Sequence, residues 1–286
     1  MKCLVVGASS YIAKAFIKKY ETQCSITALT RNDRLHSYFD LTDEQFQGFD
    51  LLINFTAIVH QKKPDLESSH TINTELAIFL AKKAKKAGIT HFIQMSTIAV
   101  YSPSSTHINE STQTLPTTVY GQTKLKADVQ LSAMRSSTFK IAIIRPPVVY
   151  GPDAPGNMHA LISLIQKGIP LPFLYTKNHR AILYIDNLTN ALFQIMLLQA
   201  DGIFILRDEL SPSLATLSTT INQHLQKECK LFTPPTLLIK FLIRFKKLPF
   251  FKLYGDLELD DSFAYQKIGR YSTISLNEAL EKTIKG

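Results

Sequence analysis

Two side chains that can exchange protons stand four residues apart in the sequence Tyr120-Gly121-Gln122-Thr123-Lys124. On a helix, residues at this spacing point from the same face. An ammonium beside a phenol favours the phenolate, so Lys124 is expected to lower the pKa of Tyr120 toward neutrality. Such a tyrosine can serve as a general acid and base. One such pair can also arise by chance, so the surrounding elements must decide its meaning.

Those elements are apolar runs that alternate with helical patterns through the first half of the chain. Strands are expected at residues 2–6, Ser25–Thr30, Asp50–Phe55, His91–Met95 and Lys140–Arg145, and helices at residues 11–20, Thr71–Lys86 and Val119–Met134. This alternation predicts an α/β fold with a doubly wound parallel sheet of the Rossmann type. In such sheets ligands bind at the carboxyl ends of the strands. The fourth strand ends at Thr97, and Tyr120 begins the next helix, so both belong to that edge.

The pattern changes after Tyr150, where a loop over residues 151–157 precedes a helix at Met158–Lys167. A short strand at Leu183–Ile185 and a helix at Asn187–Leu198 are predicted to return to the sheet. We therefore expect residues 1–150, joined by about 183–206, to form a dinucleotide-binding domain. A smaller C-terminal substrate-binding lobe would comprise residues 151–182 and 207–286.

A candidate cofactor turn follows the first strand, in the sequence Gly7-Ala8-Ser9-Ser10-Tyr11-Ile12-Ala13. Backbone amides at the start of a helix can hold a pyrophosphate. Gly7 can supply the tight turn, and Ala13 is small enough for close packing of helix on strand. Ser10 replaces a second glycine, and it can either crowd the phosphates or donate a hydrogen bond to them. An ordinary strand-to-helix turn is the alternative.

Cofactor choice is expected at the end of the second strand, at Thr30-Arg31. An acidic residue there would accept hydrogen bonds from the ribose of NAD, whereas an arginine can hold the 2′-phosphate of NADP. Arg31 therefore favours NADP(H), with NAD(H) as the alternative, unless it is a solvated loop residue. Asp40-Leu41 lies further along the chain, where an adenine contact is expected.

Composition limits the other classes of function. The chain has 286 residues and a formal charge of +9, but the basic residues come with no nucleic-acid recognition motif, so no nucleic acid is expected as a partner. Its three cysteines have no metal-ligand spacing, and no metal site is predicted. No signal peptide or bilayer-spanning run is evident, which predicts a cytoplasmic location.

A mixed apolar and basic stretch at Leu237–Lys247, with more apolar residues up to Leu253, suits either an anionic membrane surface or a helix inside the lobe. We favour the helix.

Several segments in order resemble one family, the extended short-chain dehydrogenases, and within it the NAD-dependent epimerase/dehydratase group that acts on sugar nucleotides. The resemblance spans nearly the whole chain. It is carried by residues 6–12, 50–57, 92–101, 120–124, 145–152 and 183–188, with 253–260 and 274–280 pointing to the subgroup that epimerises or reduces C4 of a UDP-sugar.

The resemblance implies a role for each matching residue. Thr97, Tyr120 and Lys124 would be catalytic. Substrate would contact Thr97, Asn157 and Arg180. The cofactor would contact Gly7, Ser10, Tyr11, Ile12, Arg31, Asp40, Leu41, Phe55, Thr56, Ala57, Lys124, Pro147 and Val148. The resemblance also implies a place in bacterial surface polysaccharide synthesis, and a homodimer formed through the helices at residues 71–86 and 119–134.

The chain departs from the family pattern by having one glycine in the first loop where three are usual, by Asp153 in place of a usual glycine and by Thr123 in place of a usual serine. A non-catalytic sensor that binds a dinucleotide is therefore the rival hypothesis. If the chain is an enzyme, the same residues serve a 4-epimerase and a 4-keto reductase. Arg31 favours the reductase, because NADPH is a consumed reductant.

Overall fold

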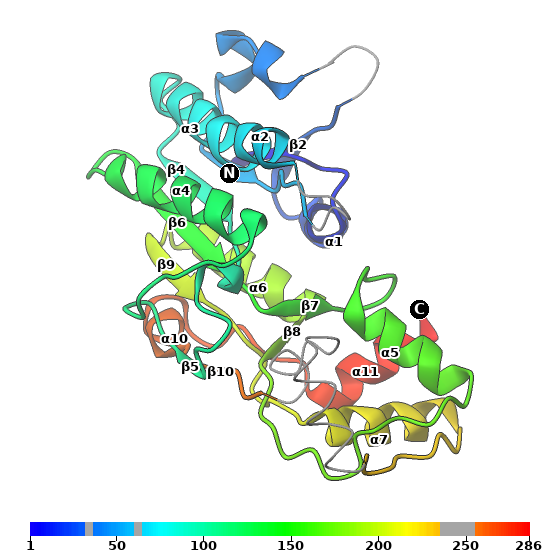
Figure 1. Cartoon of the computed structure of the whole chain (residues 1–286). Coiled ribbons are helices and arrows are strands. Elements are labelled where there is room, and N and C mark those ends of the chain that lie inside the picture. Colours follow the sequence, from blue (N-terminus) through cyan, green and yellow to red (C-terminus); the bar gives the residue numbers. More distant parts are fainter. Residues whose placement is uncertain (32–36, 60–64, 235–254) are drawn as a thin grey trace.

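The computed structural model describes residues 1–31, 37–59, 65–234 and 255–286 (Figure 1). Its centre is a six-stranded sheet in the order β2-β1-β3-β4-β6-β9, and all neighbouring strands run parallel. The strands are β1 (Lys2–Val6), β2 (Ser25–Leu29), β3 (Leu51–Asn54), β4 (His91–Met95), β6 (Lys140–Arg145) and β9 (Gly202–Ile205). The predicted doubly wound parallel sheet is confirmed.

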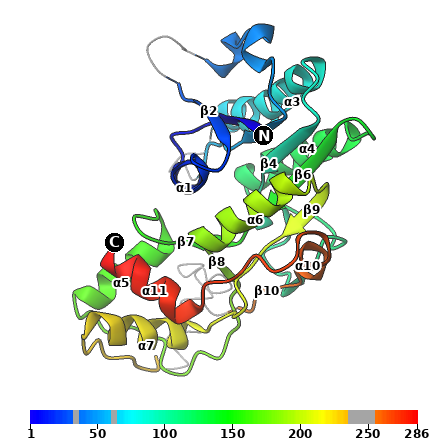
Figure 2. The same ribbon diagram turned by 180° about the vertical axis from the view of Figure 1, so that it is seen from behind.

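Helices cover both faces of this sheet, and the first strand shows why. Cys3 and Val5 on β1 point into one core with α1 (Tyr11–Tyr20) and α6 (Ile185–Leu197). Leu4 and Val6 point into the other core, which includes residues of α3 (Leu76–Lys86) and α4 (Val119–Ala133). Figures 1 and 2 show the two pairs of helices on opposite faces. A strand buried on both faces needs consecutive apolar residues, which is the pattern of β1 from Cys3 to Val6.

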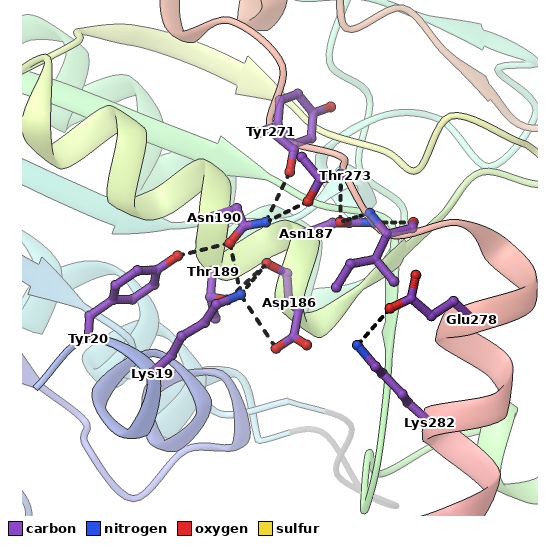
Figure 3. A network of polar contacts seen from close by, with 11 residues as sticks. Lys19, Tyr20, Asp186, Asn187, Thr189, Asn190, Tyr271, Thr273, Glu278 and Lys282 are labelled. Atoms are coloured by element: carbon purple, nitrogen blue, oxygen red, sulfur yellow. Dashed lines mark hydrogen bonds and ion pairs between the residues drawn. The ribbon is translucent and has the colours of Figure 1, made fainter.

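Side-chain hydrogen bonds join α1 to α6 and to the C-terminal segment (Figure 3). Lys19 Nζ and Tyr20 Oη donate to Asn190 Oδ1 over 2.8 and 2.9 Å. Asn190 Nδ2 in turn donates to the carbonyl oxygen of Tyr271 over 3.3 Å. These bonds fix the far end of the helix whose N-terminus follows the candidate cofactor turn.

The helix expected at Thr71–Lys86 begins five residues earlier. It comprises α2 (Leu66–His70), a π-helical turn labelled η3 (Thr71–Glu75) and α3. Asp65 caps the first turn by accepting from the amide nitrogens of Glu67 and Ser68. Single π turns within helices are frequent at functional sites.

The lower part of the molecule in Figure 1 contains α5 (Asn157–Gln166), α7 (Leu214–Leu225) and α11 (Leu276–Lys285), which share a core of their own. The remaining elements are β5 (His107–Ile108), β7 (Val148–Tyr150), β8 (Ile182–Tyr184), β10 (Glu258–Leu259), α10 (Ser262–Ile268) and the short turns η1 (Tyr38–Asp40), η2 (Asp43–Phe46) and η4 (Ile98–Val100).

Two features differ from the expected division of the chain. β8 pairs with β7 and lies outside the six-stranded sheet, which instead gains β9. α10 falls in the segment assigned to the lobe. Its residues Ala264 and Ile268, however, are buried in the core that packs α1 and α6 against the main sheet. Both differences arise from contacts between distant segments, which local periodicity does not reveal.

No helix in the part of the chain that the structure describes is long and apolar enough to cross a membrane. The basic and apolar stretch at 237–253 lies outside the described residues.

Candidate active site at the carboxyl edge of the sheet

The carboxyl ends of four adjacent strands bring the predicted site segments to one edge. β1 runs into Gly7, β3 into Phe55, β4 into Thr97 and β6 into Pro147. Because neighbouring parallel strands end at the same edge, segments far apart in sequence become neighbours there.

Gly7 cannot be replaced at this edge without strain. Its φ of +82° is one that side chains rarely adopt, and an added Cβ would lie 2.9 Å from the amide nitrogen of Thr56. The turn after β1 thus packs directly on the backbone that follows β3. Its other bonds lead to β2, because the amides of Gly7 and Ala8 both donate to the carbonyl oxygen of Leu29.

Ser10 has a structural role in addition to the two that its sequence position suggests. It is the N-cap of α1, and its Oγ accepts a hydrogen bond of 3.3 Å from the amide nitrogen of Ala13. The amides of Tyr11 and Ile12 take no partner among the described residues, so the helix start keeps two donors for an anion. The Tyr11 hydroxyl is also buried without a hydrogen-bond partner in the described structure.

The end of β2 presents Arg31 to solvent. Beside it lies the buried Tyr38, whose hydroxyl bonds the backbone of Leu29, Arg31 and Gly7 and so ties η1 to the cofactor turn. Sequence reasoning missed Tyr38, and no spacing signal points to it.

The predicted adenine contacts are placed differently. Asp40 Oδ2 accepts from the amide of Ser37, so the carboxylate caps its own turn. The Leu41 side chain is buried in the core, and so is that of Phe55. The two side chains thus lie in the cores on opposite faces of the sheet, and their contact with a cofactor stays a prediction.

Thr97 and Tyr120 are brought together by a close approach of two turns. Thr97 caps η4 by accepting from the amide of Ala99, and its side chain hydrogen-bonds Tyr120. Thr118 caps α4 by accepting from the amide of Gly121. A Cβ at Gly121 would lie 2.2 Å from the carbonyl oxygen of Ala99, so only glycine lets α4 begin this close to η4.

The expected effect of Lys124 on Tyr120 is not found. Burial raises the pKa of Tyr120 to about 12, and the hydrogen bond from Thr97 offsets this only in part. The Lys124 ammonium donates instead to the carbonyl oxygens of Thr56 and Met95, over 3.2 and 2.8 Å. The prediction failed because four-residue spacing fixes the face of a helix and not the direction in which a long side chain turns. Tyr120 is accordingly protonated near neutral pH.

Lys124 is itself almost completely buried. Desolvation lowers its pKa to about 8, and the negative charge of Asp128, one helical turn further along α4, opposes that shift. Two carbonyl acceptors and one carboxylate therefore offset the free-energy cost of burying the Lys124 ammonium.

Residues that sequence reasoning did not assign to the site surround this helix. Asp128 Oδ2 accepts from Ser96 Oγ and from Arg145 Nε. On the other side, Asn73 in the π turn accepts from the Ile58 amide and donates to Thr123 Oγ1. The spacing of Tyr120, Lys124 and Asp128 at four-residue steps is a signal that could have revealed Asp128.

The remaining predicted residues lie at the edge or in the lobe. Pro147 is buried and Val148 is exposed at the start of β7, while Thr56 is buried and Ala57 is exposed after β3. Asn157 is the exposed first residue of α5. Arg180, just before β8, is half-buried and donates to the carbonyl oxygen of Gly255 over 3.0 Å. Partial burial lowers its pKa.

This geometry fits a dinucleotide. The start of α1 offers two unpartnered amides beside a glycine turn, and the adjacent strand ends carry a proton donor and a buried cation. No group of three or more histidine, cysteine or acidic side chains suited to a metal occurs among the described residues.

Comparison with known proteins agrees with this arrangement. Residues 3–203 match the model of the NAD dependent epimerase/dehydratase family. A UDP-glucose 4-epimerase of Vibrio cholerae is 28% identical over 96% of this chain and 87% of its own length. The crystal structure of a UDP-glucuronic acid 4-epimerase from Bacillus cereus in complex with NAD superposes with a TM-score of 0.81 at 18% identity, covering 100% of this chain and 98% of that one. A human epimerase family protein with NADPH gives 0.79 at 16% identity, with both chains fully covered.

Proposed function

The chain belongs to the NAD dependent epimerase/dehydratase family, and from this premise we propose that it is a nicotinamide-dependent 4-epimerase of a UDP-sugar. The proposal rests on the position of Thr97, Tyr120 and Lys124 together at the sheet edge. They lie next to the start of α1, where the amides of Tyr11 and Ile12 have no hydrogen-bond partner among the described residues. The Vibrio cholerae relative supports the choice of C4, because it matches along nearly the whole chain.

The cofactor residues have separate tasks in this proposal. The amides of Tyr11 and Ile12 would bind the pyrophosphate, and Gly7 keeps the turn close to β3. Arg31, exposed after β2, would contact the adenosine ribose or its 2′-phosphate. A bound nicotinamide dinucleotide supplies the hydride acceptor and donor.

The reacting groups then follow from their positions. Tyr120 exchanges a proton with the sugar oxygen at C4, and Thr97 hydrogen-bonds the Tyr120 hydroxyl and orients it. Lys124, which donates to the carbonyl oxygens of Thr56 and Met95, would place a buried positive charge at the ends of β3 and β4, where it favours negative charge developing on the sugar oxygen. In the lobe, Arg180 would pair with the substrate diphosphate and Asn157 would contact the sugar nucleotide.

A 4-keto reductase is the second candidate, and two observations favour it. The raised pKa of Tyr120 keeps its proton in place, which suits donation to a keto oxygen. Arg31 is free of any carboxylate partner among the described residues and can receive the 2′-phosphate of NADPH. Both candidates use the same proton donor.

The test is made on the purified full chain. Fluorescence titration with NADH and NADPH measures cofactor binding, and incubation of UDP-glucose and UDP-glucuronic acid with NAD is followed by chromatography of the C4 epimers. Epimer formation that is lost in Tyr120→Phe supports the epimerase. Consumption of NADPH only with a UDP-4-keto sugar supports the reductase. Binding of a dinucleotide without turnover of any UDP-sugar would favour the non-catalytic sensor. Absence of binding at millimolar cofactor, with no copurified dinucleotide, would contradict all three hypotheses.

A further inference from the structure

Behind the catalytic helix lies a group of buried charges that the proposed reaction does not use. Asp128 on α4 and Arg145 at the end of β6 are 1% and 3% exposed. Arg145 Nε donates to Asp128 Oδ2 over 2.9 Å, and Ser96 Oγ donates to the same oxygen over 2.8 Å. Breaking a buried ion pair by removing one partner is costly, because the other charge stays desolvated.

The Asp128–Arg145 pair contacts residues on both sides of Thr97 in the sequence. Ser96, its neighbour in sequence, is bound directly by Asp128. Arg145 Nη1 donates to the hydroxyl of Tyr101 over 2.8 Å, and the guanidinium carbon lies 5.2 Å from the centre of that ring. The segment that carries Thr97 is therefore held at both ends by one carboxylate and its guanidinium.

The same carboxylate faces the catalytic cation. Asp128 follows Lys124 by one helical turn, and the negative charge of Asp128 acts on Lys124. Tyr120 and Asp128 share α4 with Lys124, and the Asp128 carboxylate in turn meets Arg145 from β6, which contacts Tyr101 after β4. Burial raises the pKa of Asp128, while the charges of Arg145 and Lys124 and the hydrogen bond from Ser96 oppose that shift.

We infer that Asp128, with Arg145, is a positioning residue of this site: it holds the Thr97 segment against α4 and keeps Lys124 protonated in its buried place. The inference rests on the proposed function for its kinetic consequence, but its electrostatic consequence stands on the fold alone. Without the carboxylate, Lys124 and Arg145 would be two desolvated cations with no counter-charge between them. The arginine stays charged, so the lysine would lose its proton.

The direct test is the titration of Lys124 in the full chain labelled with ¹³C at the lysine ε carbon, with the resonance assigned by Lys124→Arg. In wild type the midpoint is expected near pH 8. In Asp128→Asn we expect it to fall by about one pH unit, since a nearby opposite charge shifts a pKa by about 1–3 units. An unchanged midpoint in a folded Asp128→Asn chain would overturn the inference.

A matched control is Asp261→Asn. Asp261 is another buried carboxylate, and it accepts from Arg207 Nε over 3.0 Å and from the Tyr271 hydroxyl over 2.6 Å, away from α4. It should lower the thermal midpoint of unfolding as Asp128→Asn does, yet leave the Lys124 titration at its wild-type position. An equal shift in both variants would show a general loss of structure and would also refute the inference.

Kinetics supply the second measurement. The alkaline limb of kcat against pH should move down with the Lys124 midpoint in Asp128→Asn, while KM for the UDP-sugar changes less than twofold. If Asp128→Asn does not fold, Asp128→Glu replaces it. This variant keeps the charge but displaces the carboxylate, so the titration should stay while kcat falls, and an unchanged kcat would contradict the positioning role. If wild type has no activity on any UDP-sugar, the proposed function fails, while the titration still decides the inference.

Discussion

The candidate cofactor turn and the proposed catalytic helix meet at the same sheet edge, but they depend on the sequence in different ways. The turn after β1 works through its backbone: a positive φ at Gly7, and amides at Tyr11 and Ile12. The helix α4 works through side chains, namely those of Tyr120, Lys124 and Asp128.

This difference explains why one motif is degenerate and the other intact. Many side chains can flank a backbone amide, so Ser10 can replace a glycine and even cap the helix. A proton donor, a buried cation and its counter-charge have few substitutes. Loss of glycines from the turn is thus weak support for an inactive chain.

The largest expected effect comes from removing the proton donor. Tyr120→Phe keeps the ring in its place but removes the hydroxyl that Thr97 bonds. Because general acid–base catalysis typically contributes about 10²–10⁴-fold, we expect kcat to fall by about 10³-fold. Dinucleotide affinity, measured by fluorescence titration, should stay within twofold. A variant with more than a tenth of wild-type kcat would break the assignment of chemistry to α4.

The backbone role of the turn is tested by Gly7→Ala with Gly88→Ala as its matched control. Both glycines have a φ of +82°, but an added Cβ meets Thr56 at Gly7 and open space at Gly88. The left-handed conformation alone costs about 1–2 kcal/mol for an alanine, so both variants should lose that much stability to urea. Only Gly7→Ala should also weaken dinucleotide binding, by about tenfold or more. Equal affinities in the two variants would remove the close approach as the reason for Gly7.

A smaller effect is expected where the turn region does use a side chain. Arg31→Ala should weaken NADPH binding by about tenfold, the worth of one partly exposed charge-assisted hydrogen bond, and leave NADH binding unchanged. Lys126→Ala, which removes an exposed charge on α4, serves as control. If NADPH and NADH lose affinity equally, Arg31 does not read the 2′-phosphate.

Much of the fold could be predicted because burial on both faces leaves continuous apolar runs, such as residues 3–6 in β1 and 141–144 in β6. The placement of Thr97, Tyr120 and Lys124 at the sheet edge could be predicted, because their spacing and their position after a strand are local properties. The pKa of Tyr120 could not, because it depends on burial by segments distant in sequence. Asp128 illustrates both cases. Its spacing of four residues from Lys124 can be seen in the sequence, but its partners Arg145 and Ser96 lie 17 and 32 residues away along the chain.

The smallest expected effect concerns Ser10, and it sharpens the comparison most. The Ser10 side chain accepts from the Ala13 amide, so Ser10→Ala should cost about 1 kcal/mol of stability and Ser10→Gly only a few tenths, as for other N-caps. Because the proposed phosphate donors are the amides of Tyr11 and Ile12, neither variant should change dinucleotide affinity by more than about twofold. Urea unfolding and fluorescence titration measure the two quantities on the same samples. A gain of tenfold in affinity for Ser10→Gly would mean that the serine side chain does crowd the phosphates, and that the turn depends on side chains as α4 does.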